Sequence, residues 1–167
     1  MNQPFDMSRF TQKGKMQDAP KGQSVIAPIN AGLRFIPNFV SIKPSFTSPL
    51  DIMLERIWRK VKQDYYSKSA EPRTFKLGAI FDTLCSSDIF VIGMVVKDEE
   101  GRIVADALET ALQNLAKYAK SEKASLHISE HLSNDVSALR ELVQRHCADV
   151  GVNCYFYSNP EPKKISG

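Results

Sequence analysis

The best candidate for acid–base chemistry in this chain is the adjacent pair Glu130 and His131. The pair follows a short apolar segment, 124–129, whose pattern predicts a buried strand, so it falls on the loop at the end of that strand. A carboxylate and an imidazole are side chains that transfer protons in enzymes. The sequence leaves two interpretations open, a catalytic pair and a solvated loop.

Nucleophilic and metal chemistry have weaker candidates. Cys147 and Cys154 occupy apolar positions of a predicted helix and a predicted strand, which indicates core packing, and Cys85 is a candidate thiol without an identifiable base. His127 and His131 are four residues apart, a spacing that brings two metal ligands together only on a helix, whereas this segment predicts a strand and a loop. We therefore expect no metal site and no cofactor.

Ligand-binding candidates lie in the loops that follow the predicted strands, because parallel sheets bind ligands beyond the carboxyl ends of their strands. Neither loop 43–47 nor loop 129–135 contains glycine, and the chain has no GxGxxG or GxxxxGK[ST] pattern. Residues with a Cβ keep backbone N–H groups from approaching a phosphate closely, and the acidic residues of loop 129–135 would repel it. The candidate ligand-binding residues are Lys43, Ser45, Phe46, Ser129 and Asn134.

Basic residues gather in two other places. The polar N-terminal stretch 1–23 predicts either a basic arm that docks on a protein partner or an unordered leader. One face of a predicted helix, 48–66, is basic beside Trp58 and two tyrosines, which also permits single-stranded nucleic-acid binding, although such faces are commonly solvated. The candidate partner-binding or nucleic-acid-binding residues are Arg9, Lys13, Lys15, Arg56, Arg59, Lys60 and Lys62.

Alternating strand and helix patterns position these residues. Ser48 followed by Pro49 marks a helix start, and the segment 89–96 is apolar on both faces, as in a central strand. The pattern predicts an α/β fold with three layers, α/β/α, in which helices cover both faces of a mostly parallel sheet. The predicted strands are 24–29, 35–42, 75–84, 89–97, 124–129 and 152–157, and the predicted helices are 48–66, 104–120 and 136–150.

Length and composition set broader limits. The 167 residues, 43% of them hydrophobic, predict one domain, 24–158, between the arm 1–23 and a tail, 159–167. The chain lacks an apolar run long enough to cross a bilayer and a secretory apolar core near its start, so we expect no membrane contact. Three cysteines without a paired spacing favour a reducing, cytoplasmic setting. The net charge of +3 permits nucleic-acid contact without requiring it.

Four segments resemble the macrodomain family of ADP-ribose-binding α/β/α modules. The helix from Pro49 and the later Leu77-Gly78 pair resemble the family's first helix and its "LG" strand. The segment 89–101 (IFVIGMVVKDEEG) is similar to its central strand and turn, 107–127 to a helix of "A-L" pairs before an "S-I-H" strand, and 151–157 to its closing "G-V-x-V-x-V-Y" strand. The resemblance covers residues 24–157 and implies the macrodomain fold.

The loops depart from the family pattern. In the family the first binding loop carries a glycine run and the second is glycine-rich, and none of the family's catalytic residues has a matching position here. We therefore expect a non-enzymatic, degenerate macrodomain-like scaffolding protein that binds a protein partner through its arm and ADP-ribose weakly or not at all, as would suit a viral or phage accessory protein. One alternative is a divergent ADP-ribose or nucleotide hydrolase, in which Phe46 or Tyr155 stacks on a base while Glu130 and His131 act. The other is a single-stranded nucleic-acid-binding protein.

Overall fold

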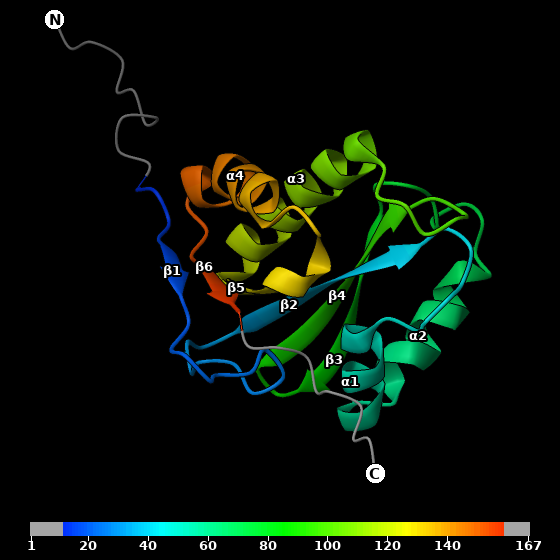
Figure 1. Ribbon diagram of the computed structural model, residues 1–167, viewed down its shortest axis with the longest axis horizontal. Coiled ribbons are helices and arrows are strands. Elements are labelled where there is room, and N and C mark those ends of the chain that lie inside the picture. The colour runs from blue at the N-terminus through cyan, green and yellow to red at the C-terminus, as the bar shows by residue number, and fades with distance from the viewer. Residues whose placement is uncertain (1–11, 159–167) are drawn as a thin grey trace, which may run out of the picture.

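The computed structural model describes residues 12–158, which form a six-stranded sheet with the strand order β1-β6-β5-β2-β4-β3 (Figure 1). Neighbouring strands pair in parallel throughout, except that β3 runs antiparallel to β4. The sheet is therefore mostly parallel, as predicted. The strands are β1 (Met16–Asp18), β2 (Arg34–Ser41), β3 (Ile80–Ser86), β4 (Ile89–Lys97), β5 (Ser125–Ser129) and β6 (Cys154–Tyr157).

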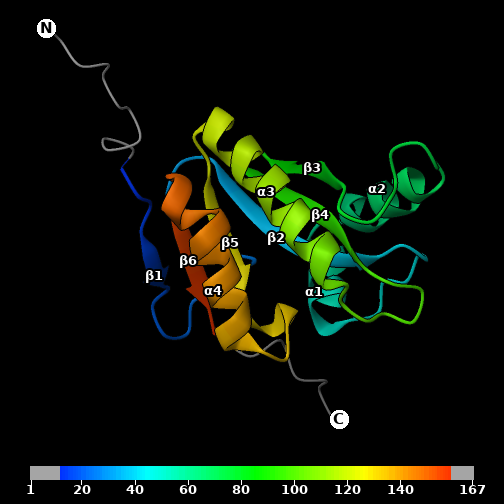
Figure 2. The same ribbon diagram turned by 90° about the horizontal axis from the view of Figure 1, so that it is seen from above.

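Helices lie on both faces of this sheet (Figures 1 and 2). In β3, Thr83 donates a hydrogen bond to Asp64 of one helix, and its neighbour Asp82 accepts one from Tyr118 of another. Because successive side chains of a strand point to opposite faces, these helices lie on opposite sides, and the predicted α/β/α layering is confirmed. The helices are α1 (Pro49–Ile57), α2 (Lys60–Ser69), α3 (Ala105–Glu122) and α4 (Val136–His146). None of these, within residues 12–158, is long and apolar enough to cross a membrane.

Strand β2 is the centre of the sheet, since it pairs with both β4 and β5 and all eight of its residues are buried. The predictions for this strand and for β4 are confirmed. The buried amide of Asn38 in β2 donates to the carboxylate of Asp51, at 2.9 Å. Asp51 in turn completes a capping box with Ser48 at the start of α1, so a polar group of the central strand helps to place that helix.

The predicted strand 24–29 is wrong, because this segment forms turns over the sheet. The N–H of Ala27 donates to the Ser24 carbonyl within the segment, and side chains bond other backbone groups. The buried Arg34 guanidinium donates to the carbonyls of Pro28 and Gly32 and pairs with Asp88 at 2.9 Å. The N–H of Ile29 donates to the hydroxyl of Tyr157.

The helix predicted over 48–66 is two helices, α1 and α2, that break at Trp58. Trp58 has φ −134° and ψ 88°, and its side chain packs against the core. The strand predicted from residue 75 begins at Ile80, and α4 is capped by Asp135 and not by Ser133 or Asn134. Helix α4 ends at His146, and a short 3₁₀ turn, Ala148–Val150, leads to Gly151 at φ +109°, the left-handed C-terminal residue that the sequence predicts.

The described part of the predicted arm packs on the domain. Residues 16–18 form the edge strand β1, the N–H of Gly14 donates to the carbonyl of Ala148, and Lys13 lies 3.7 Å from Asp149. Lys15 is exposed and its carbonyl accepts from the N–H of Cys154. The predicted arm 1–23 therefore includes residues 16–18, which the structure places in the sheet of the domain. Arg9 and the tail 159–167 lie outside the described residues.

We expect Gly14→Ala to detach β1 from the sheet. A Cβ at this position would lie 2.0 Å from the backbone oxygen of Val152, which cannot move without breaking the adjoining pairing. The free energy of unfolding should fall by about 1–3 kcal/mol, and the amide of Cys154 should exchange with deuterium faster. Gln17→Ala, an exposed change in β1 itself, should leave both measurements near the wild type; equal effects of the two changes would contradict this account.

Candidate functional site

A hollow of about 490 Å³ lies at the carboxyl ends of β4 and β5, between the loops that lead into α3 and α4. We call it the strand-end hollow. It lies where parallel sheets of this kind bind ligands, and its volume is within the range of small-molecule sites. Its lining residues are Lys97, Gly101, Arg102, Ile103, His131, Leu132, Ser133, Asn134 and Asp135.

The loop between β4 and α3 is shaped by Asp98. One carboxylate oxygen of Asp98 accepts the N–H groups of Glu100 and Arg102, each at 2.9 Å, and Gly101 turns the chain at φ +82°. The Ser41 hydroxyl at the end of β2 donates to the Asp98 carbonyl at 2.6 Å. Asp98 therefore folds the loop, while the exposed Arg102 guanidinium stays beside the hollow, 3.6 Å from the Asp98 carboxylate.

The loop between β5 and α4 is held by an arginine. The Glu130 carboxylate lies 2.9 Å from Arg140 of α4, and the same guanidinium pairs with Asp18 of β1. Arg140 also lies over the ring of Phe156, 4.4 Å from its centroid. The ion pairs of Arg140 thus connect this loop, α4 and β1. Glu130 belongs to this ion-pair network, whereas His131 lines the hollow, so the two residues of the predicted acid–base pair have different surroundings.

The other residues of this loop are also engaged in its structure. The buried Ser129 hydroxyl accepts the N–H of His131 at 3.2 Å, which begins a 3₁₀ turn, Glu130–Leu132. The Asp135 carboxylate accepts the N–H of Ala138 at 3.0 Å and caps α4. Both carboxylates of the loop therefore have internal partners, and the charge of Glu130 is offset by Arg140.

The loop after β2 is fixed from beneath by Tyr65 of α2. Its hydroxyl donates to the Ser41 carbonyl at 2.7 Å and accepts the N–H of Ser45 at 3.1 Å, and burial raises the pKa of this phenol. Phe46 is buried with its ring centroid 5.8 Å from that of Tyr65. The prediction that Phe46 stacks on a base is therefore wrong for this structure. Lys43 and Ser45 are exposed but do not line the strand-end hollow.

A buried chain of hydrogen bonds runs through His127 in β5. The N–H of Ile29 donates to the Tyr157 hydroxyl, which lies 2.6 Å from Nδ1 of His127, and Nε2 lies 2.8 Å from the Ser125 hydroxyl. Ser125 in turn donates to the carbonyl of Leu33 at 3.4 Å. Because the Ser125 hydroxyl donates to Leu33, it accepts the N–H of Nε2, and the Tyr157 hydroxyl donates to Nδ1. The imidazole is therefore neutral, and both of its nitrogens are hydrogen-bonded.

Burial, helped by the charge of Arg34, lowers the pKa of His127 from 6.5 to about 3. Tyr155 stacks on the imidazole, with a centroid distance of 5.0 Å, so this aromatic ring already has a partner. His127 is therefore a core histidine that joins segment 24–33 to β5 and β6.

The thiols lack the features of nucleophiles. Burial raises the pKa of Cys147 to about 12 and also raises that of Cys154, and both are core residues as predicted. Burial likewise raises the pKa of the half-buried Cys85 to about 11, so this thiol stays protonated at neutral pH. Within residues 12–158 no cluster of three or more His, Cys, Asp or Glu is placed to hold a metal ion.

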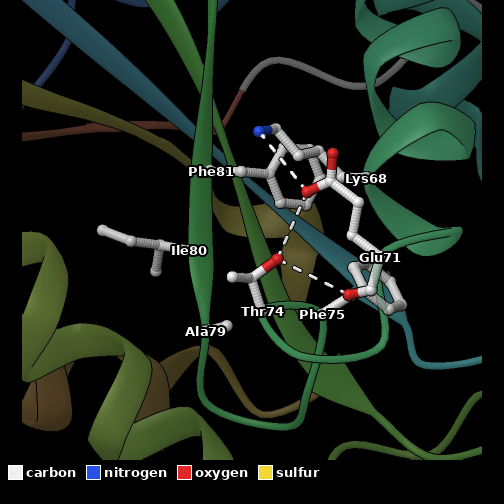
Figure 3. Close-up of a pocket in the computed structure, with 7 residues that line it drawn as sticks. All are labelled: Lys68, Glu71, Thr74, Phe75, Ala79, Ile80 and Phe81. Carbon is white, nitrogen blue, oxygen red and sulfur yellow. Dashed lines mark hydrogen bonds and ion pairs between the residues drawn. The ribbon is translucent and has the colours of Figure 1, made fainter.

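A smaller hollow of about 130 Å³ lies between the end of α2 and the start of β3 (Figure 3). Its polar groups bond one another: the Thr74 hydroxyl donates to Glu71, whose carboxylate lies 3.9 Å from Lys68. Phe75 and Phe81 also line it. Because these polar groups are already paired, the hollow offers a ligand few unused contacts.

Of the candidate ligand-binding and catalytic residues, His131 and Asn134 are brought to the strand-end hollow. Lys97 and Arg102 were not among the candidate ligand-binding residues, although the predicted strand 89–97 ends at Lys97. The available signal was their position at the end of the central strand β4 and in the loop that follows it. Of the basic candidates, Arg56, Arg59 and Lys60 lie exposed on or beside α1, and Lys62 lies 3.4 Å from Glu55.

No protein-family model matches the chain, and no curated protein matches its sequence. Solved structures do match. A macrodomain protein from Streptomyces coelicolor aligns with a TM-score of 0.77 at 17% identity, over 87% of this chain and 100% of that one. The macrodomain of Thermus aquaticus DarG aligns with a TM-score of 0.70 at 13% identity, over 87% and 99%.

A third match is Thermosipho africanus DarTG in complex with ADP-ribose, with a TM-score of 0.62 at 14% identity, over 80% of this chain and 39% of that one. At these identities the likeness establishes the fold. The chain is thus a three-layer α/β protein with its strand-end loops gathered at one edge. Its particular architecture is the macrodomain fold, as the sequence resemblance predicts.

We expect Tyr65→Phe to loosen the loop after β2. The change leaves the Ser41 carbonyl and the Ser45 N–H without their buried partner, which should cost about 1–2 kcal/mol of unfolding free energy. Amide exchange at Ser45 should accelerate. Tyr66→Phe, which removes a hydroxyl from the exposed neighbouring ring, is the matched control, and an equal effect there would contradict the assignment.

We also expect His127 to make the fold sensitive to acid. Because its pKa is about 3 when folded and about 6.5 when unfolded, the unfolded chain takes up the proton between those values and the folded chain does not. This contribution to stability is present above about pH 6.5 and is lost as the pH falls. In urea titrations, lowering the pH from about 7 to about 4.5 should cost His127→Gln about 2 kcal/mol less than it costs the wild type. An unchanged loss in His127→Gln would refute this assignment.

Proposed function

We propose that this protein is a binding module for an anionic nucleotide-type ligand of the ADP-ribose class, held at the strand-end hollow. The observation that carries the proposal is the position of the hollow at the beginnings of two helices. Ile103 lies two residues before α3, and Asp135 caps α4. Helix N-termini carry partial positive charge and N–H groups that favour phosphate. That of α3 has no side-chain cap, whereas the Asp135 carboxylate already occupies that of α4.

Side-chain charge supports the same ligand class. Lys97 and Arg102 line the hollow, while Glu130 and Asp135 are engaged by Arg140 and by the N–H of Ala138. A pyrophosphate would therefore meet two cations beside the N-terminus of α3, with His131 and Asn134 in the same lining. The DarTG structure, which shares the fold, holds ADP-ribose.

The contacts favour a protein that binds this ligand without reacting with it. A general base must be able to reach the proton that it abstracts, and the Glu130 carboxylate is held by Arg140, which also pairs with Asp18 in a structural ion-pair network. The scaffolding function expected from the glycine-free loops is not needed to explain the hollow. The absence of glycine from loop 129–135 instead predicts that the side chains of this loop, more than its backbone N–H groups, contact the ligand.

We expect isothermal titration to show saturable binding of ADP-ribose, and Lys97→Ala and Arg102→Ala each to weaken it by about tenfold, because each removes a charge next to the phosphates. Lys120→Ala, an exposed change at the far end of α3, is the charge-matched control and should bind as the wild type does.

Two results would count against this proposal. Absence of saturable heat at about 1 mM ADP-ribose would overturn the ligand class. Loss of binding in Lys43→Ala but not in Lys97→Ala would move the ligand to the loop after β2 and overturn the site. Incubation with ADP-ribosylated protein should release no ADP-ribose.

A further inference from the structure

The exposed face of α1 combines aliphatic and basic side chains around a shallow depression. Ile52 and Ile57 are 45% and 51% exposed, which is unusual for large aliphatic residues on a short helix. A depression of about 330 Å³ is lined by Ile52, Glu55, Arg56 and Arg59. We call the set Ile52, Arg56, Ile57 and Arg59 the α1 basic surface.

Helical spacing and the break at Trp58 produce this surface. Ile52 and Arg56 are four residues apart and so share one side of α1, whereas Met53 and Leu54 are buried on the other. Arg59 lies beyond the end of α1 and lines the same depression. The chain leaves the α1 helix after Ile57, and Trp58 packs inward against the core. Among residues 12–158, no helix or strand buries the side chains of Ile52 and Ile57.

The charge of the surface is uncompensated. Within residues 12–158, neither Arg56 nor Arg59 forms an ion pair with an acidic side chain. The neighbouring acid, Glu55, lies 3.4 Å from Lys62, which offsets its charge. Two guanidinium groups thus flank an aliphatic depression, and guanidinium groups match carboxylates with paired hydrogen bonds.

Aliphatic anchors favour a peptide over a nucleic acid as the occupant. Single-stranded nucleic acids bind to exposed aromatic rings on which bases stack. Here Tyr65 is buried, Trp58 is packed against the core, and the Tyr66 ring has Lys62 at 6.0 Å from its centroid. The exposed apolar groups beside the arginines are isoleucines, which bury aliphatic side chains but offer no face for a base.

We propose that the α1 basic surface is a docking site for an acidic peptide segment that places an aliphatic side chain in the depression between Ile52 and Arg59. Carboxylates on either side of that anchor pair with Arg56 and Arg59. The site shares no lining residue with the strand-end hollow, so the inference stands apart from the proposed nucleotide ligand.

Methyl NMR on the full chain tests the site directly. The protein is labelled with ¹³C at isoleucine methyl groups and titrated with a synthetic amphipathic peptide of glutamate and leucine. We expect saturable shifts at Ile52 and Ile57 and none at Ile36 and Ile128, which are buried in the sheet. A peptide with serine in place of leucine, and one with lysine in place of glutamate, should each bind at least about tenfold more weakly.

The paired variant Arg56→Glu with Arg59→Glu should lower the affinity for the glutamate–leucine peptide by at least about tenfold. The matched control is Lys117→Glu with Lys120→Glu, which reverses two exposed charges at the same spacing on α3 and should leave the affinity unchanged. Equal losses in both variants, equal binding of the lysine peptide, or no shift at Ile52 and Ile57 would overturn the proposal. Tighter binding of an oligothymidine at the same methyl groups would overturn it in favour of a nucleic-acid surface.

Discussion

Burial of the central strand β2 on both faces is the constraint on which the rest of this structure depends. Each large apolar side chain buried there contributes about 1.5–3 kcal/mol, but burial on both sides requires a helical layer on each face. The one side-chain amide on the strand, that of Asn38, donates to Asp51, whose carboxylate also accepts the N–H of Ser48 in the capping box of α1. The strand therefore determines where α1 begins and so where the α1 basic surface lies.

Side-chain bonds shape the loops at the ends of the strands. Tyr65 holds the loop after β2, Asp98 the loop after β4, and Arg140 the loop after β5. The Ser41 hydroxyl joins the first two of these loops. A glycine-rich loop can bring its backbone close to a phosphate, whereas these loops present side chains from a fixed frame. Recognition at the strand-end hollow is therefore expected to depend on charge and to weaken with added salt.

The predictable parts of the fold are those with a strong local pattern. Strand β4 was predicted at its observed bounds because it is apolar on both faces, and α3 was predicted from its apolar stripe. The break at Trp58 was not predictable, because no proline or glycine marks it and only packing against the core explains it. Segment 24–29 has strand-like residues, but two side chains outside it, those of Arg34 and Tyr157, form hydrogen bonds with its backbone.

The site was less predictable than the fold because it forms from segments that meet only in space. Lys97 and His131 line one hollow although 33 intervening residues separate them, and no local spacing relates the two. Phe46 has an aromatic ring of the kind that stacks on bases, yet this ring is buried beside Tyr65. Residue type alone therefore predicted ligand contacts in the loop after β2 and missed the residues of the loop after β4 that line the hollow.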